Sequence, residues 1–473
     1  MNPVRMTLSR SSPAIALAAA VFLSGCAVGP NYEKPDTTEI TPAAWRWQTA
    51  APRDAAPRGE WWTVFRDADL NHLEARALAG NQNLKAGIAR VDQARANARG
   101  VAAEFAPDIR LNGGVKREQT SGNLPSPVPV TIPESRYNTF NSGFDLSYEI
   151  DFWGKVRRKW ESAKATAAAS EADFHSMLLT LTGDVAVNYF ALRAADAELA
   201  ALRRTITIRE RAFDITNQKF NAGTVGQIDL ARSKTEVSTA KAELADVLRQ
   251  RRETADTLAL LCGEPATNFN LPERPLNLTP PAIPAGIPAD LLERRPDIAS
   301  AEREVAARNA DIGVAKAAYF PSIRLTGNGG TLSKESGDLF SADSKVWSIG
   351  PSLSLPVTGY ALIGANVRRT KAAREEAIAN YRQAVLTAVK DVETSLAQIR
   401  YRREQEVAQN AALESSTTAA DLIRTQYEGG TVGQLDLLES ERTRLLVERQ
   451  SAQLSAQRLI ATVRLIKALG GKW

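Results

Sequence analysis

Residues 220–236 read FNAGTVGQIDLARSKTE, and residues 427–443 read YEGGTVGQLDLLESERT, so one glycine-rich turn occurs twice, 207 positions apart. Such a turn can reverse the chain between two helices, because glycine adopts backbone conformations that other residues avoid. Self-similarity at a fixed offset is the signature of a duplicated architecture. The chain is therefore predicted to contain two copies of a helical hairpin, each with its own tip.

The duplication extends to the segments that precede the hairpins. FAPDIRL at 105–111 aligns with YFPSIRL at 319–325, at an offset of 214 that then decreases to 207. The first copy therefore has extra residues between the aligned segments. Extra residues confined to one connection indicate a surface loop, and the proline-rich run at 125–133 is its expected place.

The beginning of the chain has the character of a secretion signal. Arg5 and Arg10 precede an apolar run over 14–23, which is too short to span a membrane as a mature helix. The run ends in LSGC at 23–26, which resembles the lipobox of bacterial lipoproteins, where cleavage before the cysteine exposes it for acylation. We expect a lipoprotein signal peptide at 1–25.

Cys26 is thus the expected lipidation site, carrying covalent acyl chains such as palmitate that would tether the following segment, 26–65. The alternative is an ordinary small residue near a conventional cleavage site. Ala27 stands where an inner-membrane retention signal would have Asp, which favours the Gram-negative outer membrane. The second cysteine, Cys262, is expected to be a buried apolar residue without a disulfide.

Composition narrows the function classes. The net charge is +5, and Arg5 and Arg10 of the signal contribute to it, so the mature chain is too weakly basic to indicate nucleic-acid binding. The two histidines, His72 and His175, are expected on solvated helix faces. The chain has no nucleophile elbow, metal-ligand spacing or phosphate loop, so we expect no enzyme, no catalytic residue, no metal and no cofactor apart from the lipid on Cys26.

Four short segments alternate with period two, as strands with one apolar and one polar face do. The clearest covers 140–152; 347–355 matches it in the second copy, and their expected partners are 109–116 and 323–330. One side of the clearest strand carries Phe140, Phe144, Leu146, Tyr148, Ile150 and Phe152, and the other carries Asn141, Gly143, Asp145, Ser147, Glu149 and Asp151.

Strands of about ten residues with an apolar outer face are typical of transmembrane barrels; the alternative is a half-buried strand in a soluble sheet. No helix is evidently available to cover the apolar side. After the signal, no apolar run reaches the roughly 18 residues of a membrane helix, so a membrane crossing would need strands. Open sheet edges are excluded in lipid, and four strands are too few to close, so other subunits must contribute. Two chains would give eight strands and three would give twelve; we favour three.

Very long helices are expected in each copy, because no proline occurs at 134–264 or at 357–473. Apolar residues spaced by three and four form a coiled-coil-like seam between 154 and 222, and a stretch of roughly 68 residues would be on the order of 100 Å long. The matching stretch covers 360–428. The alternative for such helices alone is a coiled-coil spacer.

Three further motifs carry a family resemblance. They are CAVGPNYEKP at 26–35, LLERRPDIASAEREVAARNADIGVAKAAYFPSIRLTG at 291–327, and ALGGKW at 468–473. With them, the chain from residue 26 onwards resembles the TolC/OprM family of outer-membrane efflux factors, and within it the lipoprotein branch sometimes called NodT.

The resemblance implies a mainly α-helical homotrimer with a long periplasmic α-barrel below a shared β-barrel of twelve strands, four from each chain. Such a protein passively conducts drugs or other small toxic solutes out of the cell. Its implied partners are a periplasmic adaptor, an inner-membrane transporter of the resistance-nodulation-division type, and outer-membrane lipid. The alternatives are an adaptor lipoprotein or, within the family, a channel for metal cations or for type I secretion.

The implied organisation has two repeats after the anchored segment. The first, 66–290, comprises a helix, a strand pair at 107–152, a hairpin at 154–262 and a linker at 263–290. The second, 291–473, comprises a helix, a strand pair at 321–357, a hairpin at 360–469 and a short tail.

The resemblance also assigns roles to the tips. In the family the two turns are the docking surface for the adaptor, which maps onto Gly223, Thr224, Val225 and Gly226 and onto Gly430, Thr431, Val432 and Gly433. A helix-reversing turn without a partner is the alternative, but it does not explain why Thr-Val-Gly-Gln recurs.

The acidic ring of the family's periplasmic gate maps onto Asp436 and Glu439. Carboxylates from several subunits around a narrow axis repel one another and attract cations. The alternative is that Asp436, like Asp229 of the first tip, only stabilises the start of a helix. Val432 occupies the place of an Arg that helps to lock the tip in TolC.

Overall fold

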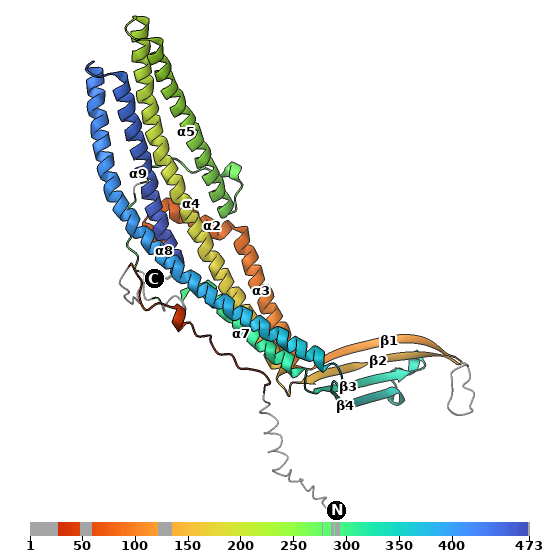
Figure 1. Ribbon diagram of the computed structural model, residues 1–473. Helices are drawn as coiled ribbons and strands as arrows, with labels where there is room; N and C mark the ends of the chain where they lie inside the picture. Colours follow the sequence, from red (N-terminus) through yellow and green to blue (C-terminus); the bar gives the residue numbers. More distant parts are fainter. Residues whose placement is uncertain are drawn as a thin grey trace, which may run out of the picture. The chain divides into compact units, whose positions relative to one another are not determined.

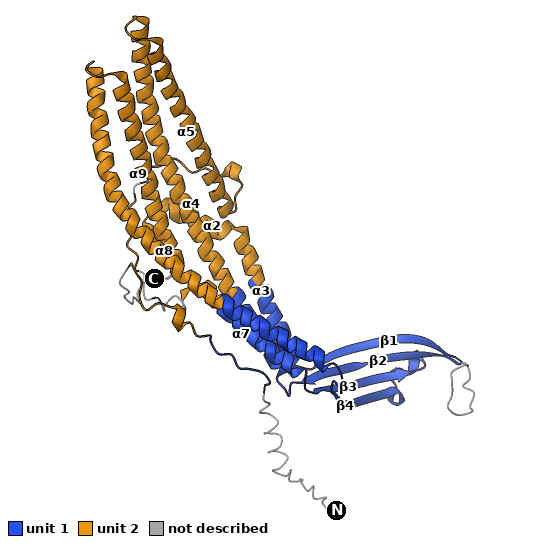
Figure 2. Ribbon diagram, in the orientation of Figure 1, with its two compact units in different colours: residues 1–35, 91–170, 301–380 blue, residues 36–90, 171–300, 381–473 orange. Residues whose placement is uncertain are grey.

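The computed structural model describes residues 27–47, 59–121, 135–276, 278–284, 288 and 294–471. The expected signal peptide, Cys26 and the loop at 125–133 lie outside these residues. The chain divides into two compact units, coloured in Figure 2: residues 1–35, 91–170 and 301–380 form one, and residues 36–90, 171–300 and 381–473 form the other. Each unit therefore contains parts of both sequence copies.

Unit 1 contains a four-stranded antiparallel sheet (Figure 1). Its strands are β1 (Asp108–Thr120), β2 (Ser135–Ile150), β3 (Ser322–Ser333) and β4 (Lys345–Ser354), and they pair in chain order. Strands β2 and β3 come from different copies, so backbone hydrogen bonds join the two repeats into one sheet. Strands β1 and β4 form its two edges.

The strand register separates an apolar from a polar face. It aligns Leu111, Phe144, Gly329 and Trp347 across the four strands, and every second residue in each strand shares their face. The apolar side chains of that face are Ile109, Leu111, Val115, Phe140, Phe144, Leu146, Tyr148, Ile150, Ile323, Leu325, Trp347, Ile349, Pro351 and Leu353. Leu111 is 68% exposed and Trp347 is 78% exposed, so the single chain leaves this face uncovered. The predicted alternation is confirmed.

The opposite face of the sheet is polar. On this face the backbones of neighbouring strands β2 and β3 approach each other closely. The amide of Asn112 donates to Asp145, and Arg324 lies 3.6 Å from Glu149. Gly143 pairs with Gly330 on this face, and a Cβ added to Gly330 would lie 2.2 Å from the carbonyl oxygen of Ser142. Bulky residues on one face and missing side chains on the other favour a sheet that curves toward its polar face.

Helices make up most of the chain, as expected. The long ones are α4 (Lys155–Asn221), α5 (Gln227–Cys262), α8 (Tyr360–Glu428) and α9 (Gln434–Ala468). The shorter ones are α2 (Ala68–Gly80), α3 (Gln82–Ala102) and α7 (Pro296–Ala317), and 3₁₀ turns occur at Thr38–Ile40, Trp61–Phe65, Ala103–Phe105, Ala266–Asn268, Ser336–Asp338 and Ala342–Ser344. Helix α4 has 67 residues, which corresponds to about 100 Å.

No helix within the described ranges is both long enough and apolar enough to cross a membrane. In unit 2 the hairpin α4–α5 packs against the hairpin α8–α9 (Figure 1). Leu199 and Leu202 of α4, Val247 of α5 and Leu445 of α9 share one buried cluster. The two sequence copies are therefore packed together in this unit by apolar contacts as well as hydrogen-bonded in the sheet of unit 1.

The segment that follows Cys26 is held against the helices of unit 1. The N–H of Val28 donates to the carbonyl of Trp153 over 2.9 Å, and the side-chain amide of Asn309 donates to the carbonyl of Pro30 over 3.0 Å. A Cβ on Gly154 would lie 2.7 Å from the Cα of Ala27. Residue 27 is therefore fixed at the junction between β2 and α4.

Unit 2 also buries an unpaired acid. Glu74 of α2 is 0% exposed, and neither carboxyl oxygen has a hydrogen-bond partner among the described residues. Burial raises its pKa from 4.5 to about 9, so the folded protein keeps this carboxyl protonated at neutral pH. Cys262 is also buried, as predicted, and burial raises the pKa of its thiol to about 11.

Replacing Glu74 by Gln should remove a pH-dependent loss of stability. Between the ordinary pKa and about 9, the unfolded chain releases the proton that the folded chain holds. Wild-type stability therefore falls as pH rises through this range, by about 1.4 kcal/mol for each pH unit. Thermal unfolding in detergent at about pH 5 and about pH 8 should show that the advantage of Glu74→Gln grows with pH.

Glu264→Gln is the matched control. Arg76 donates to this half-exposed carboxylate and lowers its pKa, so Glu264 is mainly ionised in both the folded and the unfolded chain at the two test values. Its replacement should change the melting temperature by nearly the same amount at both. Equal shifts for Glu74→Gln at the two pH values would contradict the neutral, buried state of Glu74.

Candidate functional site

The first hairpin tip is closed by a helix-terminating motif. The N–H of Thr224 donates to the carbonyl of Lys219, and the N–H of Gly223 donates to the carbonyl of Phe220, both over 2.9 Å. Gly223 has a φ of +73°, which is the left-handed conformation that ends such a helix and that favours glycine. This geometry explains the glycine at position 223.

The second tip repeats the same geometry. The N–H of Thr431 donates to the carbonyl of Gln426 over 2.9 Å, and Gly430 also has a φ of +73°. The hydroxyl of Thr431 donates to that same carbonyl over 2.9 Å, as the hydroxyl of Thr224 does to Lys219 over 2.8 Å. The recurring Gly-Thr pair therefore ends a helix, with the N–H and the hydroxyl of the threonine both donating to one carbonyl of the last turn. It does not account for the recurring Gln.

The predicted acidic residues lie at the start of α9. The carboxylate of Asp436 accepts a hydrogen bond from the N–H of Gly433 over 3.2 Å, which satisfies a donor at the helix start. Both Asp436 and Glu439 are exposed, and Asp229 occupies the equivalent place in the first tip, half-buried. The structure thus gives Asp436 a capping contact and leaves Glu439 free to face a groove.

An ion-pair network joins α8 to α9 just behind the second tip. Arg424 donates to the carboxylate of Glu441 over 2.5 Å, and Arg444 lies 2.7 Å from the same carboxylate. Arg424 also lies 3.3 Å from Asp421. The side chain of Glu441 is only 1% exposed, so its removal would leave two cations without their buried partner. The network holds the second hairpin together as one body.

The first hairpin lacks this network. Positions equivalent to Arg424, Glu441 and Arg444 are Asn217, Lys234 and Val237. Other ion pairs join its helices. Arg209 of α4 donates to the backbone carbonyl of Glu236 over 2.9 Å and lies 3.1 Å from its carboxylate, and Lys241 of α5 lies 2.7 Å from Glu210 of α4. The two tips thus share their caps and differ in how their helices are joined.

Polar contacts connect one hairpin to the other. The side-chain amide of Gln434 donates to the hydroxyl of Ser233, which lies 3.4 Å from the hydroxyl of Thr216. The ammonium of Lys219 lies 5.2 Å from the centre of the Tyr427 ring, which is a cation–π distance. Ser233 and Thr216 are buried, so these contacts belong to the interface between the hairpins.

A groove of about 490 Å³ separates the first turns of α5 and α9. Its α5 side includes Ile228 and Arg232, and its α9 side includes Leu435, Glu439 and Arg442. Ile228 is 67% exposed and Leu435 is 59% exposed, so the groove has an apolar rim in the single chain. A few charged groups beside exposed apolar ones suit recognition of another protein rather than catalysis.

Comparison with known proteins identifies the fold. The family model for outer membrane efflux proteins matches residues 73–264 and 287–471. The chain belongs to the outer membrane efflux protein family.

Relatives and solved structures agree along the whole chain. The pyoverdine export outer membrane protein OpmQ of Pseudomonas aeruginosa is 33% identical over 461 residues, covering 97% of this chain and 96% of OpmQ. The CmeC outer membrane channel of Campylobacter jejuni matches with a TM-score of 0.88 at 27% identity, covering 94% of this chain and 95% of CmeC. The open state of the MtrE outer membrane channel of Neisseria gonorrhoeae matches with a TM-score of 0.83 at 29% identity, covering 94% and 98%.

This efflux protein is therefore an outer-membrane channel that extends into the periplasm, and it is not an enzyme. The sequence-based predictions of family, fold class, function and location are confirmed. The described part of the chain has four strands, the number expected for each subunit of the channel.

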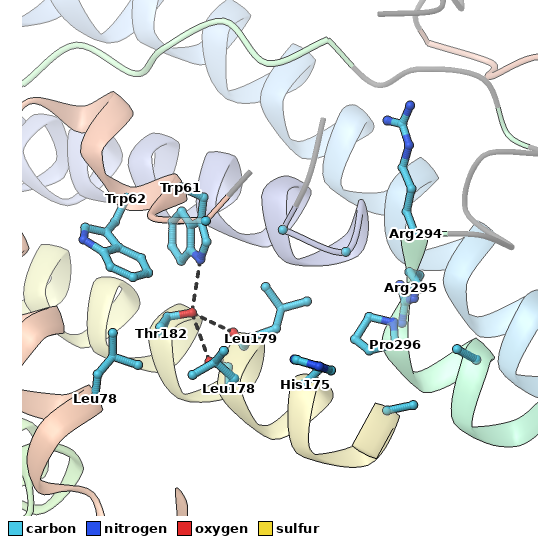
Figure 3. A pocket seen from close by; sticks show the side chains of 15 residues that line it. Trp61, Trp62, Leu78, His175, Leu178, Leu179, Thr182, Arg294, Arg295 and Pro296 are labelled. Atoms are coloured by element: carbon cyan, nitrogen blue, oxygen red, sulfur yellow. Dashed lines mark hydrogen bonds between the residues drawn. The ribbon is translucent and has the colours of Figure 1, made fainter. Parts of the chain in front are cut away.

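An apolar cavity of about 380 Å³ in unit 2 of the efflux protein is shown in Figure 3. Trp61, Leu178 and His175 are among its lining residues, and the indole N–H of Trp61 donates to the hydroxyl of Thr182 over 3.1 Å. None of the predicted site residues lies there. His175 and His72 are both exposed, as the sequence predicted.

Two sets of contacts at the tips were not predicted from the sequence. The ion-pair network around Glu441 has no local motif, because its members are polar residues on two helices of a seam. The contact between Gln434 and Ser233 did have a signal, since both copies contain TVGQ followed by Ser after five intervening residues.

Proposed function

We propose that this efflux protein works as a homotrimer whose three sheets close into one twelve-stranded barrel. The support is the sheet of unit 1, which has an uncovered apolar face, a polar face and two edges, β1 and β4. In lipid the backbone groups of both edges need partners, and β1 of one copy can pair with β4 of the next. Four strands are below the bacterial minimum of about eight, so closure requires several chains.

The exit duct would receive its solutes through partners at the hairpin tips. We propose that a periplasmic adaptor docks on 223–226 and 430–433, and that an inner-membrane transporter of the resistance-nodulation-division type supplies drugs or other small toxic solutes. The exposed rim residues Ile228 and Leu435 support a protein partner, because tip-to-tip packing would cover them.

Two measurements test the assembly and its use. Purified in detergent, the protein should have the mass of three chains, since fewer cannot supply twelve strands. Deletion of the gene should raise susceptibility to the exported compounds, and the complementing gene should restore resistance. A monodisperse monomer would contradict the shared barrel, and unchanged susceptibility across a broad panel of toxic compounds would contradict drug efflux.

We propose that the second tip forms the periplasmic constriction, with Asp436 and Glu439 as its acidic ring. Glu439 is exposed on α9, and Asp436 retains one carboxylate oxygen beyond its contact with Gly433. The network around Glu441 joins α8 to α9, so opening would displace this hairpin as a body. Contacts between hairpins, such as that of Gln434 with Ser233, are the ones that must then break.

Asp436→Asn and Glu439→Gln should raise the single-channel conductance in lipid bilayers and lower the preference for cations, because both remove negative charge at the constriction. Asp229→Asn is the matched control, since Asp229 occupies the same place in the first tip. It should leave conductance and selectivity unchanged. Identical behaviour of all three variants would reduce Asp436 and Glu439 to residues that stabilise a helix start.

We propose that Cys26 carries the lipid anchor. The support is the lipobox together with the position of Ala27, which is held beside Gly154 at the base of the sheet. Acyl chains on the preceding residue would then enter the membrane where the strands begin. Mass spectrometry of the N-terminal peptide should show an acylated Cys26, and Cys26→Ala should abolish the added mass. An unmodified thiol in the wild-type protein would contradict the proposal.

A further inference from the structure

The contact between Gln434 and Ser233 has an equivalent residue pair one repeat away that forms no such hydrogen bond within the described part of the single chain. Subtracting the repeat offset of 207 from Gln434 gives Gln227, and adding it to Ser233 gives Ser440, so both residue types recur. In the single chain Gln227 is exposed, and among the described residues no hydrogen bond joins it to Ser440. The hydroxyl of Ser440 donates to the carbonyl of Leu437 over 2.9 Å, which leaves its oxygen able to accept.

The apolar surroundings recur in the same way. Within the chain, Tyr427, Val432 and Leu437 of the second copy belong to one cluster with Ala212 and Ile215 of the first.

The positions one repeat away are also apolar: Phe220, Val225 and Leu230 in the first copy, and Ala419 and Leu422 in the second. Leu422 is 60% exposed and Phe220 is 36% exposed. The cluster between the two hairpins thus has an equivalent set of apolar residues one repeat away. In the single chain that set is divided between the two hairpins, and its members Leu422 and Phe220 are exposed.

The correspondence is weaker away from the tips. Farther along the helices, Leu445 of α9 shares a buried cluster with Leu199 and Leu202 of α4. One repeat away, the residues equivalent to these three are polar: Ser238, Glu406 and Gln409. Those equivalent to Ala201 and Val247 of the same cluster are apolar, Ala408 and Leu454. The apolar match is therefore more complete at the tips than in this part of the junction.

We propose that Gln227 of one subunit donates its side-chain amide to the hydroxyl of Ser440 in a neighbouring subunit, with Phe220 packed against Leu422 beside it. The proposal rests on the trimeric assembly proposed above. Every hairpin in the ring would then be joined to both of its neighbours by the same Gln–Ser contact, once within the chain and once between chains. This accounts for the identical Thr-Val-Gly-Gln in both copies.

The Gln–Ser contact within the chain and the proposed one between chains differ in the hydrogen-bonding groups around the serine. Behind Ser233 lies the buried hydroxyl of Thr216, at 3.4 Å, whereas the position equivalent to Thr216 is Ile423. The contact between chains therefore has one hydrogen-bonding group fewer. It is the weaker of the two, so the ring should separate at the subunit boundaries first.

Site-specific cross-linking tests the contact in the full-length protein in outer membranes. Gln227→Cys combined with Ser440→Cys, treated with a short bis-methanethiosulfonate, should give covalently linked subunits on a non-reducing denaturing gel. Gln434→Cys with Ser233→Cys is the matched control and should cross-link without an increase in mass. The parent protein and the single-cysteine variants should stay monomeric on the gel, because Cys262 is buried.

A charge exchange gives a second readout that does not depend on thiols. Gln227→Glu or Ser440→Lys alone should speed dissociation of the detergent-solubilised trimer by about fivefold or more, the change expected from losing a hydrogen bond of about 1 kcal/mol. The double variant should recover most of the loss.

Three chains in the native mass, without linked subunits and without recovery in the double variant, would overturn the contact and leave the trimer intact. A native mass of one chain would overturn the trimer itself.

Discussion

Backbone hydrogen bonding in lipid is the constraint on which the rest of this structure depends. Four strands with an apolar outer face leave two unpaired edges, and the bilayer offers no water to satisfy them. A membrane-inserted sheet of this kind must therefore be completed by copies of itself. In the proposed trimer, the pairing of β1 with β4 of the next subunit is what would make the assembly a closed ring.

Duplication gave the chain two hairpins with the same capped ends. The caps at Gly223 and Gly430 match in dihedral angle and in both threonine contacts, so the folding of each tip is local and identical. The contacts that join the two helices of each hairpin differ. The second hairpin has Glu441 buried between Arg424 and Arg444, and the first has none of these residues at the equivalent positions. In the proposed gating movement, this difference would let the second hairpin move as one body.

Sequence periodicity predicted what depends on local spacing. The alternation around Phe144 and the helical seams gave the strand faces and the long hairpins, because each follows from a repeat of two or of about 3.6 residues. The cap at Asp436 could also be anticipated, since it needs only an acid in the first turn of a helix and a backbone N–H three residues earlier. Ser233 and Gln434 are in contact although they are 201 positions apart in the sequence, and the burial of Glu74 depends on how the helices pack. Neither feature follows a sequence repeat, so neither could be predicted from one. The gate and docking roles of the tips remain predictions.

The short segment after residue 26 has a mechanical consequence. Ala27 is packed against Gly154, and Val28 is hydrogen-bonded to Trp153, so there is no slack between the start of this segment and the end of β2. A lipid on the preceding residue would therefore share one depth with the apolar face of the sheet. Anchor and barrel would then respond together to the thickness of the leaflet, and lengthening the segment by a few residues would uncouple them.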